Sequence, residues 1–130
     1  MQEDRITAMR QRAQQIVGMR VIRVRKPIQD RPQLLVLRRH PLSDAESRTV
    51  RLWLGTIAWR IDVPDRIVAG SSDPVQDVHR ELRGLLGRVV VSVQVASPSM
   101  DTTIDFAGPR LRIFPTVYDD PACDPWMVAE

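Results

Sequence analysis

Hydrophobic residues recur with a helical period in two segments of the chain. The first segment carries its apolar positions at Ile6, Met9, Ala13, Ile16 and Val17. The second carries them at Val75, Val78, Leu82 and Leu85. This spacing places each set on one helix face, and each segment ends at a glycine that can take the left-handed backbone conformation of a C-terminal cap. We therefore predict helices over residues 4–17 and 74–86.

Shorter segments alternate between apolar and polar residues, which is the pattern of strands with one buried face. It predicts strands over residues 19–26, 33–39, 48–54, 57–63, 88–96, 101–107 and 110–115. Because the connections that contain no helix are short, most strand pairs should be antiparallel. The predicted fold class is α+β, a mostly antiparallel twisted sheet of six or seven strands with two helices on one face.

The two helices and the strands after them match each other at an offset of 69 residues. Gly18, Val21, Ile22 and Val24 fall on Gly87, Val90, Val91 and Val93. A second similarity relates residues 53–61 to residues 106–113, each interpreted as a β-hairpin that turns at a glycine, Gly55 or Gly108. We interpret the pattern as an internal duplication of a helix, a strand and a hairpin. The alternative is chance, since a capped helix before a valine-rich strand also arises in unrelated segments.

The predicted organisation is a single domain over residues 1–130. The first repeat covers residues 1–70 with an insertion near 27–47, the second covers 71–116, and residues 117–130 form an acidic C-terminal tail. The insertion contains the strand at 33–39, and prolines on both sides of it favour an edge position. Such an edge could pair with another copy of the chain.

Strand alternation also assigns side chains to the two faces of the predicted sheet. The helix side would hold Ile22, Val24, Leu52, Leu54, Trp59, Ile61, Val91, Val93, Ile104, Phe106, Leu111 and Ile113. A candidate binding face on the other side and its rim would hold Arg23, Arg25, Arg38, Arg39, Arg51, Trp53, Arg60, Arg112 and Phe114.

Charge is distributed unevenly along the chain. Residues 1–60 contain 13 Arg/Lys and 5 Asp/Glu, whereas residues 61–130 contain 6 and 11. This asymmetry indicates either an anion-binding face or two surfaces that attract each other, within the fold or across a dimer. Lys26 is the only lysine and asparagine is absent, a bias typical of a GC-rich bacterial genome, so arginine richness alone is weak evidence for phosphate binding.

Candidate chemistry is sparse. Neither His40 nor His79 has a local spacing that would place it beside a nucleophile, and Cys123 lies among aspartates that would disfavour its thiolate. The acidic cluster lacks the spacing of a calcium loop, and residues 69–74 lack a phosphate-binding glycine motif. We predict no catalytic residue, no cofactor and no metal.

The single cysteine and the lack of a Cys/His cluster are typical of a reducing compartment, which favours a cytoplasmic location. The first residues lack the pattern of a signal peptide, and no window approaches the roughly 20 apolar residues of a membrane span. We therefore predict a soluble protein with no membrane partner.

Residues 80–126 resemble a family of small bacterial, largely actinobacterial, proteins classed as a domain of unknown function. The similarity rests on a Gly-x-x-Val strand, a Phe-x-Gly-x-x-Leu-x-Ile hairpin and a Tyr-acidic-Trp ending, at Gly87, Val90, Phe106, Gly108, Leu111, Ile113, Tyr118 and Trp126. The resemblance implies no activity and no catalytic residues. Similar small proteins resemble immunity proteins of toxin systems, which implies an interaction role.

The residue inventory of the candidate binding face favours protein binding, because Trp, Phe and Arg are enriched in interface cores. The expected partner is another protein or a second copy of the chain in a homodimer. The alternative is nucleic-acid binding through the arginine-rich face, although sheet-based binders of single strands also need aromatic stacking platforms.

Overall fold

The computed structural model describes residues 2–25, 33–39, 49–54, 58–70, 74–97, 99, 101–114 and 126–129. Two helices lie in these ranges, α1 (Gln2–Ile16) and α2 (Val75–Arg83). The strands are β1 (Met19–Val24), β2 (Gln33–Arg39), β3 (Thr49–Leu54), β4 (Ala58–Val63), β5 (Arg66–Gly70), β6 (Ser92–Val95), β7 (Thr102–Asp105), β8 (Arg110–Phe114) and β9 (Trp126–Ala129). The sequence pattern anticipated all of these elements except β5 and β9.

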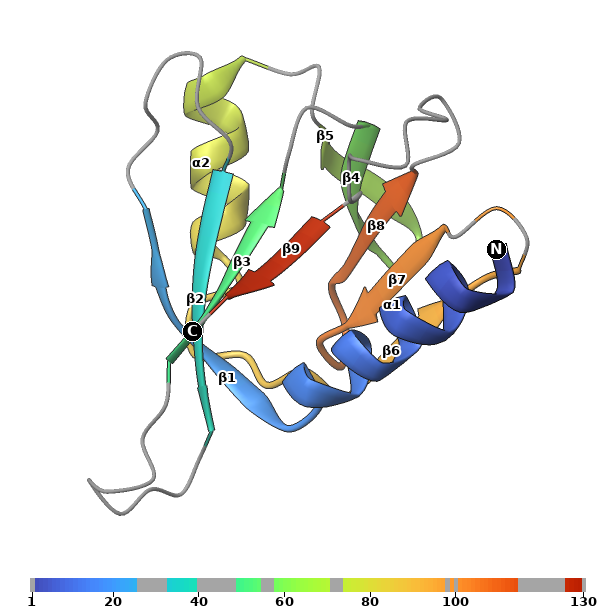
Figure 1. Cartoon of the computed structure of the whole chain (residues 1–130). Helices are drawn as coiled ribbons and strands as arrows, with labels where there is room; N and C mark the ends of the chain where they lie inside the picture. The colour runs from blue at the N-terminus through green and yellow to red at the C-terminus, as the bar shows by residue number, and fades with distance from the viewer. Residues whose placement is uncertain are drawn as a thin grey trace.

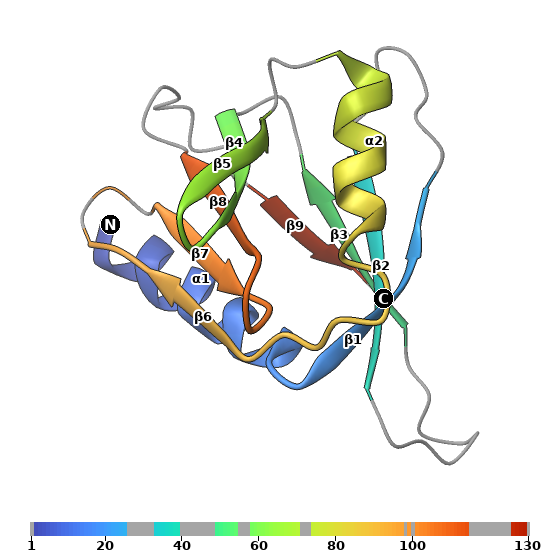
Figure 2. The same ribbon diagram turned by 180° about the vertical axis from the view of Figure 1, so that it is seen from behind.

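The strands form two antiparallel sheets, which face each other in Figures 1 and 2. The first sheet has the order β1-β2-β3-β9, and the second has the order β5-β4-β8-β7-β6. Helix α1 packs against β6, whereas α2 packs against β5 and β1. The α+β class and the antiparallel pairing are confirmed, but the strands divide into two sheets rather than one, and the helices do not share one face.

The two sheets are joined by hydrogen bonds between the start of β1 and the segment that leads into β6. Gly18 N–H donates to Val90 O and Gly87 N–H donates to Val21 O, each at 2.8 Å. Val21 N–H donates to Arg88 O at 2.9 Å, and Val90 N–H donates to Met19 O at 2.8 Å. Adding 69 to a residue of the first repeat gives its counterpart in the second, and exchanging counterparts turns each of these bonds into another of the set. This junction is therefore an approximate two-fold axis between the repeats.

The same relation extends to the strands beyond the junction. The pairs Arg23↔Val36 and Val24↔Leu35 in the first sheet correspond to Ser92↔Asp105 and Val93↔Ile104 in the second. All four equivalences keep the offset of 69. Strands β1 and β2 are thus the counterparts of β6 and β7.

This equivalence corrects the predicted insertion near 27–47. The strand at 33–39 is part of the repeat, because it is the counterpart of β7. The offset falls from 69 at Leu35 and Ile104 to 59 at their β3 and β8 neighbours, Leu52 and Leu111. The extra ten residues of the first repeat therefore lie between β2 and β3.

The fourth strand of each repeat pairs with the other repeat. Strand β4 pairs with β8, and β9 pairs with β3. The pairs Trp59↔Ile113 and Trp126↔Leu54 occupy equivalent places, so each fourth strand has a tryptophan at the same register. This exchange makes each sheet depend on both halves of the chain.

Two sequence-based expectations about strands are wrong. Residues 53–61 do not form a hairpin, because β3 and β4 belong to different sheets; only the hairpin around Gly108 forms. Strand β2 is not an edge, because β1 and β3 pair with its two sides. Within the predicted acidic tail, residues 126–129 form strand β9, whereas Asp119, Asp120 and Cys123 lie outside the described residues.

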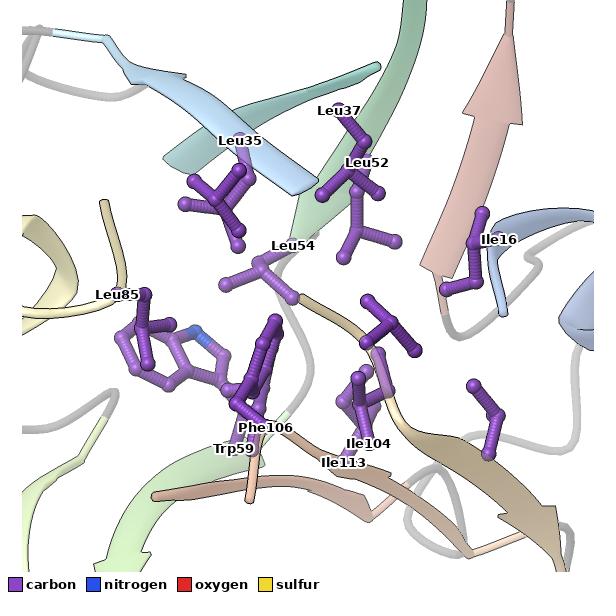
Figure 3. Packing of buried hydrophobic residues seen from close by; sticks show 14 of the residues in the cluster. Ile16, Leu35, Leu37, Leu52, Leu54, Trp59, Leu85, Ile104, Phe106 and Ile113 are labelled. Atoms are coloured by element: carbon purple, nitrogen blue, oxygen red, sulfur yellow. The ribbon is translucent and has the colours of Figure 1, made fainter. Parts of the chain in front are cut away.

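The hydrophobic core fills the space between the two sheets and is closed by the apolar faces of the helices. In Figure 3, Leu35, Leu52 and Leu54 of the first sheet point toward Trp59, Phe106 and Ile113 of the second. The apolar positions predicted for the first helix are buried, except that Val17 is half-buried. In the second predicted helix, Val78, Leu82 and Leu85 are buried.

Two residues predicted to lie in the core are exposed instead. Ile22 is 42% exposed and its counterpart Val91 is 53% exposed. The register of β1 shifts between Val21 and Arg23, which turns the intervening Ile22 outward. Strict alternation cannot anticipate such a bulge.

No helix among the described residues is long and apolar enough to cross a membrane.

The glycines at the junction give a direct test of the two-fold relation. Gly18 and Gly87 have φ values of +87° and +82°, and a Cβ at either position would meet no atom within 3.4 Å. Gly18→Ala and Gly87→Ala should each lower the free energy of unfolding by about 1–2 kcal/mol, because only backbone strain is added. Urea denaturation measures the change.

Ala107 provides the control in the opposite direction. It is the one non-glycine residue with positive φ (61°) among the described residues. Ala107→Gly should raise the free energy of unfolding by roughly 0.5 kcal/mol. Unequal losses of unfolding free energy in Gly18→Ala and Gly87→Ala would contradict the two-fold relation. A loss of unfolding free energy in Ala107→Gly would contradict the assumption that positive φ strains a non-glycine residue.

Candidate functional site

The predicted binding face is divided between the outer surfaces of the two sheets. The first sheet carries Arg23, Arg25, Arg38, Arg51 and Trp53. The second carries Arg60, Arg112 and Phe114. These two groups belong to sheets that face each other across the core, so they form two separate surfaces.

The outer surface of the first sheet carries a row of arginines on strands that contain no acidic residue. Strands β1, β2, β3 and β9 contain five arginines and no acidic residue. Arg23 and Arg51 flank Val36, and Arg20 lies directly opposite Arg38. Like charges in directly opposed positions destabilise a sheet. We call Arg20, Arg23, Arg38 and Arg51 the arginine face.

Trp53 lies at one end of the arginine face. The Arg25 guanidinium sits over the Trp53 ring at 5.2 Å from its centroid, and Leu34, buried, lies between them in the register. This cation–π contact fixes both side chains and covers one side of the indole. The aromatic group is therefore held as part of the surface rather than left as an open stacking platform.

Arg39 has a structural position instead of the predicted one. Its Nη2 donates to the Gln15 carbonyl at 3.2 Å, near the C-terminus of α1. An arginine there satisfies one of the last helical carbonyls and complements the helix dipole. Alternation explains the difference, because Arg39 shares the inward parity of Leu35 and Leu37 at the end of β2.

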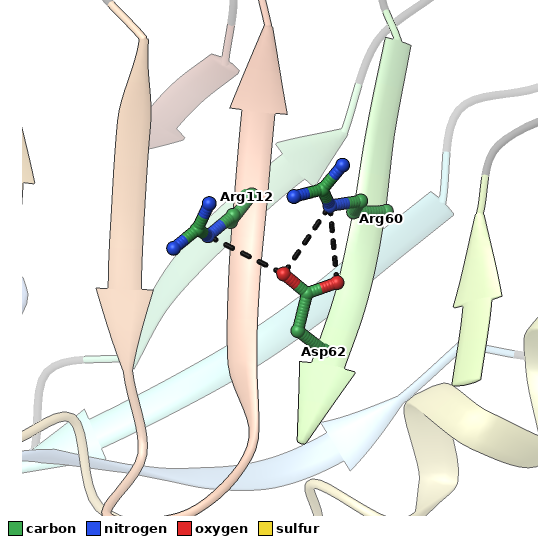
Figure 4. Close-up of polar contacts among 3 residues, drawn as sticks. All are labelled: Arg60, Asp62 and Arg112. Atoms are coloured by element: carbon green, nitrogen blue, oxygen red, sulfur yellow. Dashed lines mark hydrogen bonds and ion pairs between the residues drawn. The ribbon is translucent and has the colours of Figure 1, made fainter. Parts of the chain in front are cut away.

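The second sheet carries a compact charged cluster, shown in Figure 4. Asp62 lies between Arg60 and Arg112, with Arg60 Nε at 3.0 Å from Oδ1 and 3.2 Å from Oδ2. Arg112 Nε lies 3.3 Å from Oδ2. Arg60 also sits over the Phe114 ring at 5.1 Å. We call Arg60, Asp62 and Arg112 the arginine–aspartate triad.

The two-fold relation makes the difference between the sheets explicit. The row Arg23-Val36-Arg51-Ala129 in the first sheet corresponds to Ser92-Asp105-Arg110-Asp62 in the second. Both aspartates of the second row are replaced by apolar residues in the first, and Ser92 is replaced by an arginine. The fold accepts a neutralised face, so it does not require the positive charge of the arginine face.

Sequence reasoning missed Asp62 and Asp105. The alternation that assigned Arg60 and Arg112 to the outer face also assigns Asp62 there, so the signal was present. A pattern of positive charge alone does not reveal it. Asp105 becomes informative only through its counterpart Val36, and that comparison requires the correct strand pairing.

Elsewhere, the described residues offer little catalytic chemistry. An open hollow of about 430 Å³ on α2 is lined by Gln76, His79, Arg80, Arg83, Gly84 and Leu86. His79 Nδ1 is buried there without a hydrogen-bond partner among these residues. No group of three or more His, Cys, Asp or Glu side chains in the described ranges is placed to hold a metal ion. His40 lies outside those ranges.

No family model, curated protein or solved structure matches the chain.

The triad predicts a specific loss of stability. Asp62→Asn should lower the free energy of unfolding by about 1 kcal/mol, because two guanidinium groups lose their shared carboxylate at a partly exposed site. Added salt should reduce this loss.

Asp65→Asn is the matched control, because Asp65 is exposed in the turn between β4 and β5. It should change the free energy of unfolding by less than about 0.5 kcal/mol. Equal effects of the two substitutions in urea denaturation would show that the triad contributes nothing to the fold.

Proposed function

We propose that this chain is a non-enzymatic protein-binding module of the cytoplasm. The arginine face of the first sheet binds an acidic surface on a partner protein. The observation that carries this proposal is the arrangement of Arg20, Arg23, Arg38 and Arg51 on strands that contain no acidic residue.

The arginine face costs stability in the free protein. Two unit charges about 10 Å apart, the separation of β1 and β3 across β2, repel by about 0.4 kcal/mol in water. Arg20 and Arg38 are closer, because they lie on adjacent strands. Four such charges repel each other in the free chain, and an acidic partner would convert this repulsion into attraction.

Apolar groups between the arginines support a protein partner. Leu34 is buried, and Val36 and Trp53 are half-buried within the same surface. A mixture of aliphatic, aromatic and guanidinium groups is the composition of protein interface cores. Nucleic acid is the second candidate because of the positive charge, but Arg25 covers the Trp53 ring on which a base would stack.

Residues from the second repeat provide the variants for the test. Val36→Asp and Arg23→Ser install the counterparts Asp105 and Ser92, which the same fold already accepts. A carboxylate at position 36 would lie between Arg23 and Arg51 in the register. We expect Val36→Asp to leave the free energy of unfolding unchanged or to raise it slightly.

The same substitution should weaken the binding of an acidic partner. In fluorescence anisotropy with a labelled polyglutamate peptide, Val36→Asp should weaken the affinity of the wild-type chain about tenfold, or 1.4 kcal/mol. Arg110→Ala, on the outer face of the second sheet, is the control and should have little effect. Affinity purification with the wild-type chain as bait should retain acidic proteins, whereas Val36→Asp as bait should lose them.

The contradicting outcomes are distinct. Equal polyglutamate affinity of the wild-type chain and Val36→Asp would remove the arginine face as the site. Tighter binding of a labelled oligonucleotide than of polyglutamate, with a steep salt dependence, would favour nucleic acid. A dimer in sedimentation velocity that Val36→Asp dissociates would identify the partner as a second copy.

A further inference from the structure

We infer that Arg60 and Arg112 form a binding site for a single oxyanion of the phosphate-monoester class on the outer face of the second sheet. The site is separate from the arginine face and independent of the function proposed for it. Its parts are the arginine–aspartate triad and Phe114.

The first step in the argument is the direction of the guanidinium groups. Arg60 and Arg112 lie opposite each other on β4 and β8. The guanidinium atoms that face Asp62 are their Nε atoms, at 3.0 and 3.3 Å from its carboxylate oxygens. Figure 4 shows the terminal nitrogens of both side chains directed away from the carboxylate.

The second step is depth. The Asp62 side chain is 14% exposed, whereas those of Arg60 and Arg112 are 35% and 36% exposed. The carboxylate therefore forms the floor and the two guanidinium groups form the rim. An anion arriving from solvent would meet the terminal nitrogens of both arginines before it met Asp62.

The third step is the net charge of the triad and the hydrogen bonding of its N–H donors. One carboxylate neutralises only one of the two guanidinium groups, so the triad keeps a net positive charge. Arg112 Nε is buried and makes no hydrogen bond, although Asp62 lies at ion-pair distance. Asp62 thus lies between Arg60 and Arg112 without satisfying all of their N–H donors. A second anion, placed above the rim, completes the neutralisation.

The fourth step is preorganisation. The ring of Phe114 lies under the Arg60 guanidinium, and Asp62 accepts a hydrogen bond from Arg60 Nε and forms an ion pair with Arg112. Gly70, the β5 partner of Arg60, places no side chain beside it. Fixing two guanidinium groups before the ligand arrives lowers the entropic cost of binding.

The fold itself does not require this cluster. The counterparts of Arg60, Asp62 and Arg112 in the first sheet are Met127, Ala129 and Trp53. None of the three carries a charge, yet the first sheet forms with the same strand pairing. The triad is therefore an addition to the second sheet and not a condition for its formation.

The arrangement selects the chemical class of the ligand. Two guanidinium forks at one rim match an anion with several acceptor oxygens, and arginine binds phosphate and carboxylate groups through paired N–H donors. A dianionic phosphate offers three terminal oxygens and the larger charge, so it engages both forks, whereas a carboxylate has two oxygens and one charge. We expect phosphate to bind more tightly than acetate.

The test is a titration of the full chain with inorganic phosphate at constant ionic strength. It is followed through the ¹H–¹⁵N signals of the arginine Nε groups. The Arg60 and Arg112 signals should shift saturably with phosphate, and acetate should shift them with at least about tenfold weaker affinity. Phenyl phosphate should bind as well as inorganic phosphate if the natural source is a phosphate ester. Binding of inorganic phosphate alone would identify the free ion as the ligand.

Asp62→Asn distinguishes a binding site from a purely structural cluster. It removes the charge that competes with the ligand, so the affinity for phosphate should rise about threefold to tenfold. Arg60→Met, which installs the equivalent residue of the first sheet, should abolish the saturable shift at Arg112. Arg110→Gln, on the same face but outside the triad, should leave binding unchanged.

Three results would overturn the inference. Phosphate could shift all surface arginines alike, Asp62→Asn could weaken rather than strengthen binding in a folded chain, or Arg60→Met could bind as well as the wild-type chain. Polyglutamate binding at the arginine face does not depend on Arg60, so the two proposals fail separately.

Discussion

The pairing of residues 18–21 with residues 87–90 is the constraint on which the rest of the structure depends. Four backbone hydrogen bonds join the two repeats at this junction, and exchanging the repeats maps the set onto itself. The junction brings β1 beside the segment that leads into β6. The two sheets that it joins face each other and bury Leu52, Leu54, Phe106 and Ile113.

The exchange of fourth strands strengthens this dependence. Strands β4 and β5 complete the second sheet and β9 completes the first, although β4 and β9 each follow the third strand of the other sheet. Each sheet therefore lacks its edge on one side until the other half of the chain is present. The arrangement resembles a strand-exchanged dimer whose two subunits are joined in a single chain. It explains why the two halves form one hydrophobic core.

Much of this fold could be predicted from the sequence, and the failures have physical causes. The helices, seven strands and the offset of 69 were readable because periodicity and the paired glycines Gly18 and Gly87 are local signals. The division into two sheets was not, because alternation shows which side of a strand is buried but not which strand lies beside it. The misplaced insertion followed from the same gap, since it rested on assuming that β3 pairs with β4. For the candidate site, alternation found the outward arginines, whereas the neutralising role of Asp62 appeared only once β4 and β8 were paired.

The two repeats also separate what the fold needs from what has been added to it. Glycines, core residues and the tryptophans of the fourth strands occur at equivalent positions in both. The arginine face occurs only in the first sheet, and the arginine–aspartate triad only in the second sheet. Two sheets with equivalent strand pairing thus carry two different charged surfaces.

Native-state hydrogen exchange of the junction amides tests the central claim most directly. The amides of Gly18, Val21, Gly87 and Val90 should exchange with one common free energy of opening, equal to that of global unfolding, because opening the junction separates the repeats. Lower protection of the Gly18 and Val21 amides than of the Gly87 and Val90 amides, or exchange of all four well before global unfolding, would contradict it.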